Sequence, residues 1–189
     1  MEKNRCAWSK HSLEIAYHDS EWGVPVHDDR KHFEFIVLDT FQAGLSWLTV
    51  LKKRNNFRKA FDDFDYRTIS EYGSGKIDEL LGNPGIIRNK MKINATIKNA
   101  QAFMVIQDEF GSFDKYIWSF VNAETIVNAR ESMDSIPATS AESDEMSKNL
   151  KKRGFSFVGS TTCYAYMQAA GLVNDHETSC FRYKEVIDL

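Results

Sequence analysis

Two cysteines and two histidines near the ends of the chain are of the residue types that bind zinc. His176 and Cys180 are four residues apart, so their side chains can face the same way on one turn of helix. Cys6 and His18, near the opposite end of the chain, could complete a set of four ligands. Such a set would hold zinc in a structural role, because four protein ligands leave no open position for a reacting water. No compact zinc-finger spacing joins these residues, and the alternative is two inert buried cysteines with two surface histidines.

Residues 38–47 place several groups that can recognise a ligand around one glycine. They are a carboxylate, an amide, an aliphatic and an aromatic side chain, those of Asp39, Gln42, Leu45 and Trp47. Apolar residues at helical spacing run up to this stretch and resume after it. Gly44 is therefore predicted to stop one helix in the left-handed conformation, and Ser46 to cap the next. The plain interpretation is an ordinary elbow between two helices.

Residues 76–90 predict two helices joined by a tight Asn-Pro-Gly-Ile break. The second helix is long, with apolar residues on one face as far as Met104. A hairpin of this kind presents backbone N–H groups at the start of a helix, where a phosphate can be held. Asn-Pro-Gly turns are common, so this pattern by itself indicates a phosphate site only weakly.

The elements that would position these groups are predicted to be helices. We expect them over residues 12–20, from Asp28 or Asp29 through 39, over 46–54 and 57–61, in a short piece opened by Asp65, over the two arms of the hairpin, over 113–121, from a capping box at 139–142 to Gly154, and over 160–170. The only strand-like fragment is 155–158, and no sustained alternation of apolar and polar residues occurs. The sequence therefore predicts an all-α fold in a single domain, residues 1–189.

Composition fits a folded protein with one substantial core, at 189 residues, 42% of them hydrophobic. There is no export signal and no apolar run of the roughly 20 residues that cross a bilayer, so we expect a cytoplasmic protein without a membrane partner. Three cysteines are an odd number, which argues against a disulfide framework. The net charge of −3 is unlike that of a nucleic-acid binder, but basic residues gather at 52–59, 88–98 and 148–153. Each cluster could equally be a solvated helix face.

Several of these stretches together carry a family resemblance. The chain resembles the DNA-3-methyladenine glycosylase I family, bacterial base-excision enzymes of the helix-hairpin-helix superfamily, over nearly its whole length to about Cys180. The matching motifs are AYHDSEWG at 16–23, QAGLSW at 42–47, LKKR at 51–54, GIIR at 85–88, LKKRGF at 150–155 and GLVNDH at 171–176. The resemblance implies a helix-hairpin-helix glycosylase domain whose two termini are joined by a zinc site.

The resemblance also implies roles for particular residues. The enzyme would be a monofunctional hydrolase that flips a base out of alkylated double-stranded DNA and releases free 3-methyladenine, working as a monomer. Tyr17 and Trp47 would stack on the base, with Trp8 and Trp22 as second choices, and Asp39 would bind its edge and serve catalysis. The family's four structural zinc ligands fall on Cys6, His18, His176 and Cys180. The DNA contacts fall on the turn and the hairpin, at Gln42, Gly44, Leu45, Gly85, Ile86 and Lys90.

The chain departs from the family pattern at two positions. Asp39 replaces a glutamate, so the carboxylate is one methylene shorter, and Glu14 stands where some members carry a tyrosine. The charge of Asp39 is kept, and a carboxylate among aromatic rings favours a cationic, methylated base over ordinary adenine. We therefore expect the activity to be retained and the base contacts to differ.

Two alternatives remain at the level of sequence. A bifunctional glycosylase and lyase would need a lysine amine just after the hairpin and an aspartate further on, for which Lys90 and Asp108 are candidates by spacing. The residue directly after Arg88 is Asn89, and no iron–sulfur cysteine set is present, which argues against this class. A non-catalytic protein that binds alkylated DNA is the second alternative, made possible by the change at Asp39.

Overall fold

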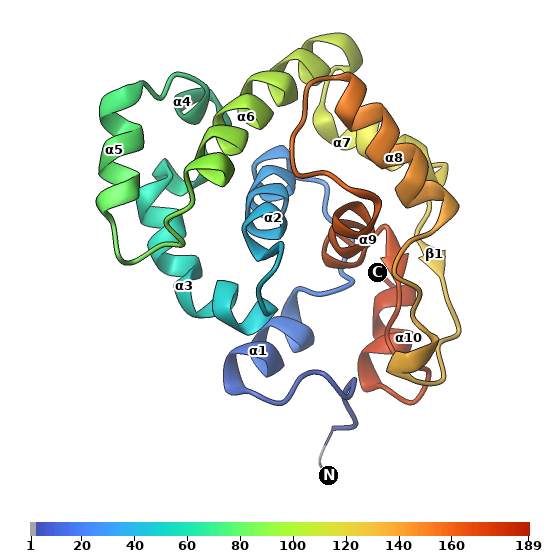
Figure 1. The fold of residues 1–189 in the computed structure, drawn as a ribbon. Coiled ribbons are helices and arrows are strands. Elements are labelled where there is room, and N and C mark those ends of the chain that lie inside the picture. The colour runs from blue at the N-terminus through green and yellow to red at the C-terminus, as the bar shows by residue number, and fades with distance from the viewer. Residues whose placement is uncertain (1–2) are drawn as a thin grey trace.

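The computed structural model describes residues 3–189, which form a mainly helical domain around one central helix (Figure 1). That helix is α2, Asp29–Gln42, and its residues are buried without interruption from His32 to Phe41. Burial all round is expected of a helix enclosed by others. In Figure 1, α3, α5 and α6 lie to one side of α2, and α8, α9 and α10 lie to the other.

The other elements follow in chain order. They are α1 Ser12–Ser20, α3 Trp47–Ala60, η1 Asp62–Phe64, α4 Tyr66–Ser70, α5 Ser74–Gly82, α6 Lys90–Phe110, α7 Phe113–Trp118, η2 Ser119–Val121, β1 Ile126–Val127, η3 Met133–Ser135, α8 Ala141–Lys152, α9 Ser160–Ala169, β2 Val173–Asn174 and α10 Phe181–Ile187. The two short strands pair in parallel, with Ile126 opposite Val173. A mainly helical fold is thus confirmed, although it is not purely α. None of the helices in the described part of the chain is long and apolar enough to span a membrane.

Several helix ends form as their sequence signals predict. Gly44 has φ +81°, in the left-handed region, two residues after Gln42, the last residue of α2. Ser46 caps α3 by accepting a hydrogen bond from the Thr49 amide at 3.2 Å. Asp65 caps α4 in the same way, and Asn89 caps α6. These local signals are reliable because each depends on atoms within three residues of the cap.

Four local expectations were wrong. The two helices expected over 46–54 and 57–61 are one helix, α3, because the polar run between them is its exposed face and holds no glycine or proline. No strand was expected, but two short strands form, and both lie outside the strand-like fragment 155–158, which is a loop. The box that starts α8 uses Ser140 and Ser143, one residue later than expected. His176 and Cys180 lie in a turn before α10, a helix that the sequence did not predict.

The two ends of the chain lie side by side. The Phe181 amide donates to the carbonyl of Asn4 at 2.9 Å, and the Asn4 side chain donates to the carbonyl of Ser179 at 2.8 Å. The Ala7 amide donates to the carboxylate of Glu177 at 3.0 Å. This pairing brings the segment around Cys6 against the segment from His176 to Cys180.

Candidate functional site

A cavity of about 300 Å³ opens between α1, α2, the start of α3, α9 and the segment around η3. Its walls are the side chains of Trp8, Glu14, Tyr17, Trp22, Asp39, Gln42, Trp47, Met133, Ile136, Ala165, Gln168 and Ala169. The residues from the first helices come from motifs that the sequence singled out. The wall from Met133 to Ile136 and the wall from α9 carried no sequence signal, because both lie more than 80 residues further along the chain.

Aromatic rings form much of the cavity wall. Tyr17 is 4% exposed, and its ring lies 5.1 Å from that of Trp47 at an angle of 53°. Trp8 and Trp22 meet edge to face at 5.1 Å on another part of the wall. The indole N–H of Trp47 is buried and has no hydrogen-bond partner among residues 3–189. It is a donor that sequence reasoning missed, because the tryptophan was considered only as a stacking surface.

Asp39 is the buried carboxylate of this cavity. It is 4% exposed on α2, and its Oδ2 atom has no hydrogen-bond partner in the described structure. Burial raises the pKa of this carboxyl well above its usual range. A buried polar atom without a partner is rare in a folded protein and marks a position where a ligand can supply the missing bond. The cavity therefore offers an unpaired acceptor at Asp39 and an unpaired donor at Trp47.

A partly buried ion network lies behind Tyr17. Arg54 on α3 donates to Glu21 at 2.7 and 2.8 Å and to Glu34 at 2.8 Å, and its guanidinium lies 6.0 Å from the Tyr17 ring. Burial alone would raise the pKa of Glu21, but hydrogen bonds from Arg54 and Lys31 lower it to about 2. No local pattern predicts this network, because Arg54 is 20 residues from Glu34 and 33 residues from Glu21 along the chain.

Glu14 faces the cavity but is already bound to the protein. Its carboxylate accepts the His11 amide at 3.0 Å and so completes a capping box at the start of α1. Glu14, which the resemblance implies is a departure from the family pattern, thus has a structural partner in this chain.

The turn between α2 and α3 projects outward at the mouth of the cavity. The Leu45 amide donates to the carbonyl of Gln42 at 2.6 Å, and the Leu45 side chain is 43% exposed. Gln42 lines both the cavity and a neighbouring hollow beside this turn. The turn therefore presents an apolar side chain to solvent next to the cavity.

Hydrogen bonds with the side chains of Asn83 and Lys53 stabilise the hairpin between α5 and α6. The Gly85 amide donates to the side chain of Asn83 at 2.8 Å, and Lys53 on α3 donates to the carbonyls of Pro84 and Gly85 at 3.0 and 3.3 Å. Ile86 is buried, at 3% exposed. Since the Gly85 N–H is already used, the amides open to an anion at this turn are those of Ile87 and Arg88, which have no acceptor within the described chain.

Lys90 and Asp108 do not meet. Both are exposed and both lie on α6, 18 residues apart along one helix. That spacing separates them by about 27 Å at 1.5 Å per residue. The two groups cannot act on one reacting carbon.

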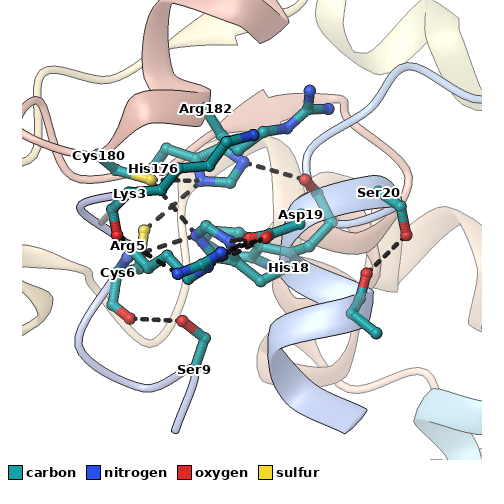
Figure 2. A network of polar contacts seen from close by, with 12 residues as sticks. Lys3, Arg5, Cys6, Ser9, His18, Asp19, Ser20, His176, Cys180 and Arg182 are labelled. Carbon is teal, nitrogen blue, oxygen red and sulfur yellow. Dashed lines mark hydrogen bonds and ion pairs between the residues drawn. The ribbon is translucent and has the colours of Figure 1, made fainter. Parts of the chain in front are cut away.

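Cys6, His18, His176 and Cys180 come together in a buried cluster (Figure 2). Their ligand atoms all lie within 4.8 Å of one another. The Sγ atom of Cys180 lies 3.4 Å from His18 Nε2 and 3.7 Å from His176 Nδ1, and Cys6 Sγ lies 3.5 Å from His176 Nδ1. A tetrahedral zinc with two sulfur and two nitrogen ligands needs pair separations of about 3.3–3.8 Å. The alternative of two surface histidines is excluded, since both are fully buried.

The groups around the cluster orient the ligand atoms. His18 Nδ1 lies 2.8 Å from the Asp19 carboxylate, and His176 Nε2 lies 3.0 Å from the carbonyl of Trp22. Each contact fixes the proton on one ring nitrogen and turns the lone pair of the other nitrogen toward the cluster, where His18 Nε2 also accepts the Cys6 amide at 3.4 Å. The ring of Trp22 also lies 4.6 Å from that of His176 and lines the cavity. The cluster therefore supports one wall of the cavity.

Comparison with known proteins gives a consistent result. A family model described as methyladenine glycosylase matches residues 7–183. The chain is 48% identical over 180 residues to DNA-3-methyladenine glycosylase 1 of Escherichia coli K12, covering 95% of this chain and 96% of that protein. It superimposes on a crystal structure of 3-methyladenine DNA glycosylase I with a TM-score of 0.92 at 50% identity, over 94% of this chain and 98% of that one. A substituted 3-methyladenine DNA glycosylase I in complex with 3-methyladenine matches with a TM-score of 0.91 at 34% identity, over 94% and 96%.

Proposed function

The chain belongs to the methyladenine glycosylase family, and we propose that it releases 3-methyladenine from alkylated DNA by hydrolysing the N-glycosidic bond. The observation that carries this function is the cavity, in which an unpaired carboxylate, Asp39, is buried among aromatic rings. This arrangement recognises a flat cation that carries hydrogen-bond donors. Methylated adenine still attached to DNA has these properties, and ordinary adenine lacks the charge.

The base must leave the duplex to reach the cavity. An enzyme of this kind flips the nucleotide out of the stack and reads the base by stacking and edge contacts. Tyr17 and Trp47 offer ring faces, Asp39 offers an acceptor for the exocyclic amino group, and the Trp47 indole offers a donor. Leu45, exposed on the turn beside the cavity, would fill the gap that the base leaves.

The chemistry requires little of the protein, because the methylated base is already a good leaving group. Water adds to the anomeric carbon of the sugar and loses a proton, while the bonding electron pair passes to the base and neutralises its positive charge. Positive charge develops on the sugar as the base loses its own. A carboxylate at Asp39 attracts the cationic nucleotide into the cavity and holds the ring in place for this step.

Duplex binding would depend on the hairpin and the turn. The N–H groups of Ile87 and Arg88 and the first turn of α6 can hold a phosphate, with Gly85 and Ile86 setting the shape of the loop. Lys90 is exposed at the same place, and Lys52 is exposed on α3, the helix that supports the hairpin. Local donors of this kind can bind DNA even though the chain is net negative.

A structural zinc is part of the proposal. Cys6, His18, His176 and Cys180 would hold it, and their donor types, the three sulfur–nitrogen separations of 3.4, 3.5 and 3.7 Å, and the oriented rings fit such an ion. The contact between the two thiols lowers the pKa of Cys180 and raises that of Cys6, so Cys180 is the cysteine that more readily takes the thiolate form that binds metal. Four protein ligands would leave no site for catalytic water, so the ion would serve only to join the two ends of the chain.

The proposal includes a monomer that works in the cytoplasm. One copy of the chain supplies every wall of the cavity, so a single molecule suffices for one flipped base. The substrate, genomic DNA, is cytoplasmic in bacteria such as the source of the Escherichia coli relative.

Base release from methylated DNA tests the function. The purified protein is incubated in excess with methylated duplex, the released bases are separated by chromatography, and a parallel sample is treated with borohydride. We expect free 3-methyladenine and no protein trapped on DNA. Trapped protein would show a lyase that uses an amine such as Lys90. Binding of methylated DNA without any base release would show a non-catalytic binding protein.

A further inference from the structure

Lys92 is a buried lysine that the proposed chemistry does not use. It lies in the first turn of α6, two residues after Lys90, and is 6% exposed. Burial lowers its pKa. A cation in the first turn of a helix also faces the positive end of the helix dipole, which is unfavourable. Its place in the fold therefore needs a compensating contact.

That contact is with the end of α2. The ammonium group of Lys92 donates to the carbonyl of Phe41 at 2.9 Å and to the carbonyl of Ala43 at 2.6 Å. The last carbonyls of a helix have no partner within the helix, and their negative dipole end attracts a cation. Ala43 has left the helical conformation, at φ −48° and ψ 116°. Lys92 thus completes the end of α2 from another helix.

Lys92 joins the turn after α2, which is expected to enter the duplex, to the hairpin before α6, which is expected to bind a phosphate. Directly after Ala43 comes Gly44 and then Leu45, the apolar side chain exposed beside the cavity. Directly before α6 comes the hairpin, and Asn89 caps α6 by accepting the Lys92 amide at 3.1 Å. One residue therefore holds both the start of the hairpin's second helix and the base of the projecting turn.

We propose that Lys92 is a positioning residue that fixes the turn carrying Leu45 relative to the phosphate-binding hairpin. When the hairpin binds the phosphate backbone of a duplex, the Leu45 side chain is then placed at the base-pair step beside the flipped nucleotide. This inference rests on the proposed function for the nature of its substrate. Lys92 touches neither base nor sugar, and its effect passes through the turn.

The experiment compares Lys92→Met with Lys115→Met, which removes an exposed lysine on α7. The first measurement uses a duplex with 2-aminopurine beside an abasic-site analogue, in which insertion of Leu45 unstacks the fluorophore. We expect Lys92→Met to lose most of the fluorescence rise at saturating protein and to keep the affinity for undamaged duplex. Lys115→Met should behave as the wild type. If Lys92→Met does not fold, Lys92→Gln, which keeps an N–H donor group of shorter reach, takes its place.

The second measurement is single-turnover release of 3-methyladenine from a paired duplex and from an oligonucleotide in which the damaged base is already unpaired. We expect a fall of about 100-fold on the paired substrate, the size that a displacement of about 1 Å can cause, and a much smaller fall on the unpaired one. A general loss of structure would lower both rates equally. Equal loss on both substrates, or an unchanged fluorescence rise, would overturn the inference.

The two measurements separate this inference from the proposed function. If the wild type releases no 3-methyladenine, the proposed function is wrong. The fluorescence comparison needs no activity, so it still decides whether Lys92 positions the turn.

Discussion

At the scale of single residues, the buried carboxyl group of Asp39 is expected to lower the stability of the free protein and to favour binding of a cationic base. Its carboxyl group is enclosed by the cavity and has an oxygen with no partner in the described structure, an arrangement that is unfavourable until a donor arrives. A cationic base supplies both the donor and the opposite charge. The resemblance implies a glutamate at this position, so we expect the shorter aspartate to keep the charge and either to draw the base deeper into the cavity or to leave room for a bridging water.

This balance predicts the effect of Asp39→Asn on stability. Burial raises the pKa of the Asp39 carboxyl in the folded protein. The protonated carboxyl therefore favours the folded state fully at pH values below the unfolded pKa of about 3.9. This contribution to the free energy of unfolding is lost as pH rises through the pKa of the folded protein. Asparagine has no such dependence. We expect Asp39→Asn to stabilise the free protein by on the order of 1–3 kcal/mol at pH 7.5. The gain should shrink toward pH 4.

Thermal unfolding across this pH range checks the prediction, with Asp108→Asn as the control because Asp108 is an exposed carboxylate. A lower Tm for Asp39→Asn at pH 7.5 would mean that the carboxylate already has a favourable partner in the free protein.

At the scale of elements, the hairpin has no room for a Cβ atom at Gly85, so one added atom would disturb its geometry. A Cβ added at Gly85 would lie 2.9 Å from the Asn83 side-chain oxygen and 3.2 Å from Cγ of Asn56. The same oxygen accepts the Gly85 amide, so a side chain here would force the loop to move. The donors at Ile87 and Arg88 would move with it.

We therefore predict that Gly85→Ala weakens binding of damaged and undamaged duplex alike. Lys52→Glu or Lys90→Glu should also weaken both and reduce the slope of log affinity against log salt by about 1 for each lost phosphate contact. Fluorescence anisotropy over a series of salt concentrations measures these effects. Lys115→Glu makes the same change of charge far from the hairpin in sequence and should leave the slope nearer to that of the wild type. If Lys52→Glu and Lys90→Glu left the slope unchanged, the hairpin would not be the phosphate site.

The elements also show how far sequence reasoning reaches. Caps such as Ser46 and Asp65 and the stop at Gly44 were predicted because each signal is local. The break expected within α3 was wrong because a polar run on an exposed face resembles a loop. The partnership of Arg54 with Glu34 and the two carbonyl contacts of Lys92 could not be predicted, since they depend on how distant helices pack.

At the scale of the whole molecule, the four Cys and His residues join the two ends of the chain. The residue types suggested that Cys6 and His18 complete a set with His176 and Cys180, and the family resemblance supported that set independently, although no sequence spacing joins the two pairs. The structure places all four together next to Trp22, which lines the cavity. Closing the chain at this point stabilises the cavity wall from outside.

We predict that the native protein contains about one zinc ion per chain, bound at this cluster. Cys180→Ala should lower Tm and zinc content and should lower activity less at a permissive temperature, because the ion takes no part in the chemistry. Cys163→Ala is the matched control, since Cys163 is buried outside the cluster. Elemental analysis and thermal unfolding measure both effects. Native protein that contains no zinc, when purified without chelators, would rule out this part of the proposal.

Gln42 connects the projecting turn to the cavity, and Lys92 connects the same turn to α6, the helix that follows the hairpin. The hairpin would bind the phosphate backbone of the DNA. Leu45 on the turn would fill the gap that the flipped nucleotide leaves in the duplex, and the cavity would receive the base. We expect these contacts to act together at the release of the base, and we propose Asp39 as the residue through which the cavity recognises it.

The most direct test is therefore the single-turnover rate of 3-methyladenine release from methylated duplex by the wild type and by Asp39→Asn, measured side by side. We predict an active wild type and a fall of about 10- to 100-fold for Asp39→Asn, which corresponds to the roughly 1.5–3 kcal/mol of a hydrogen bond to a charged group. Asp39→Glu should retain or raise the rate. Release by Asp39→Asn at the wild-type rate would contradict the account, because Asp39 would then lie outside the base-binding site.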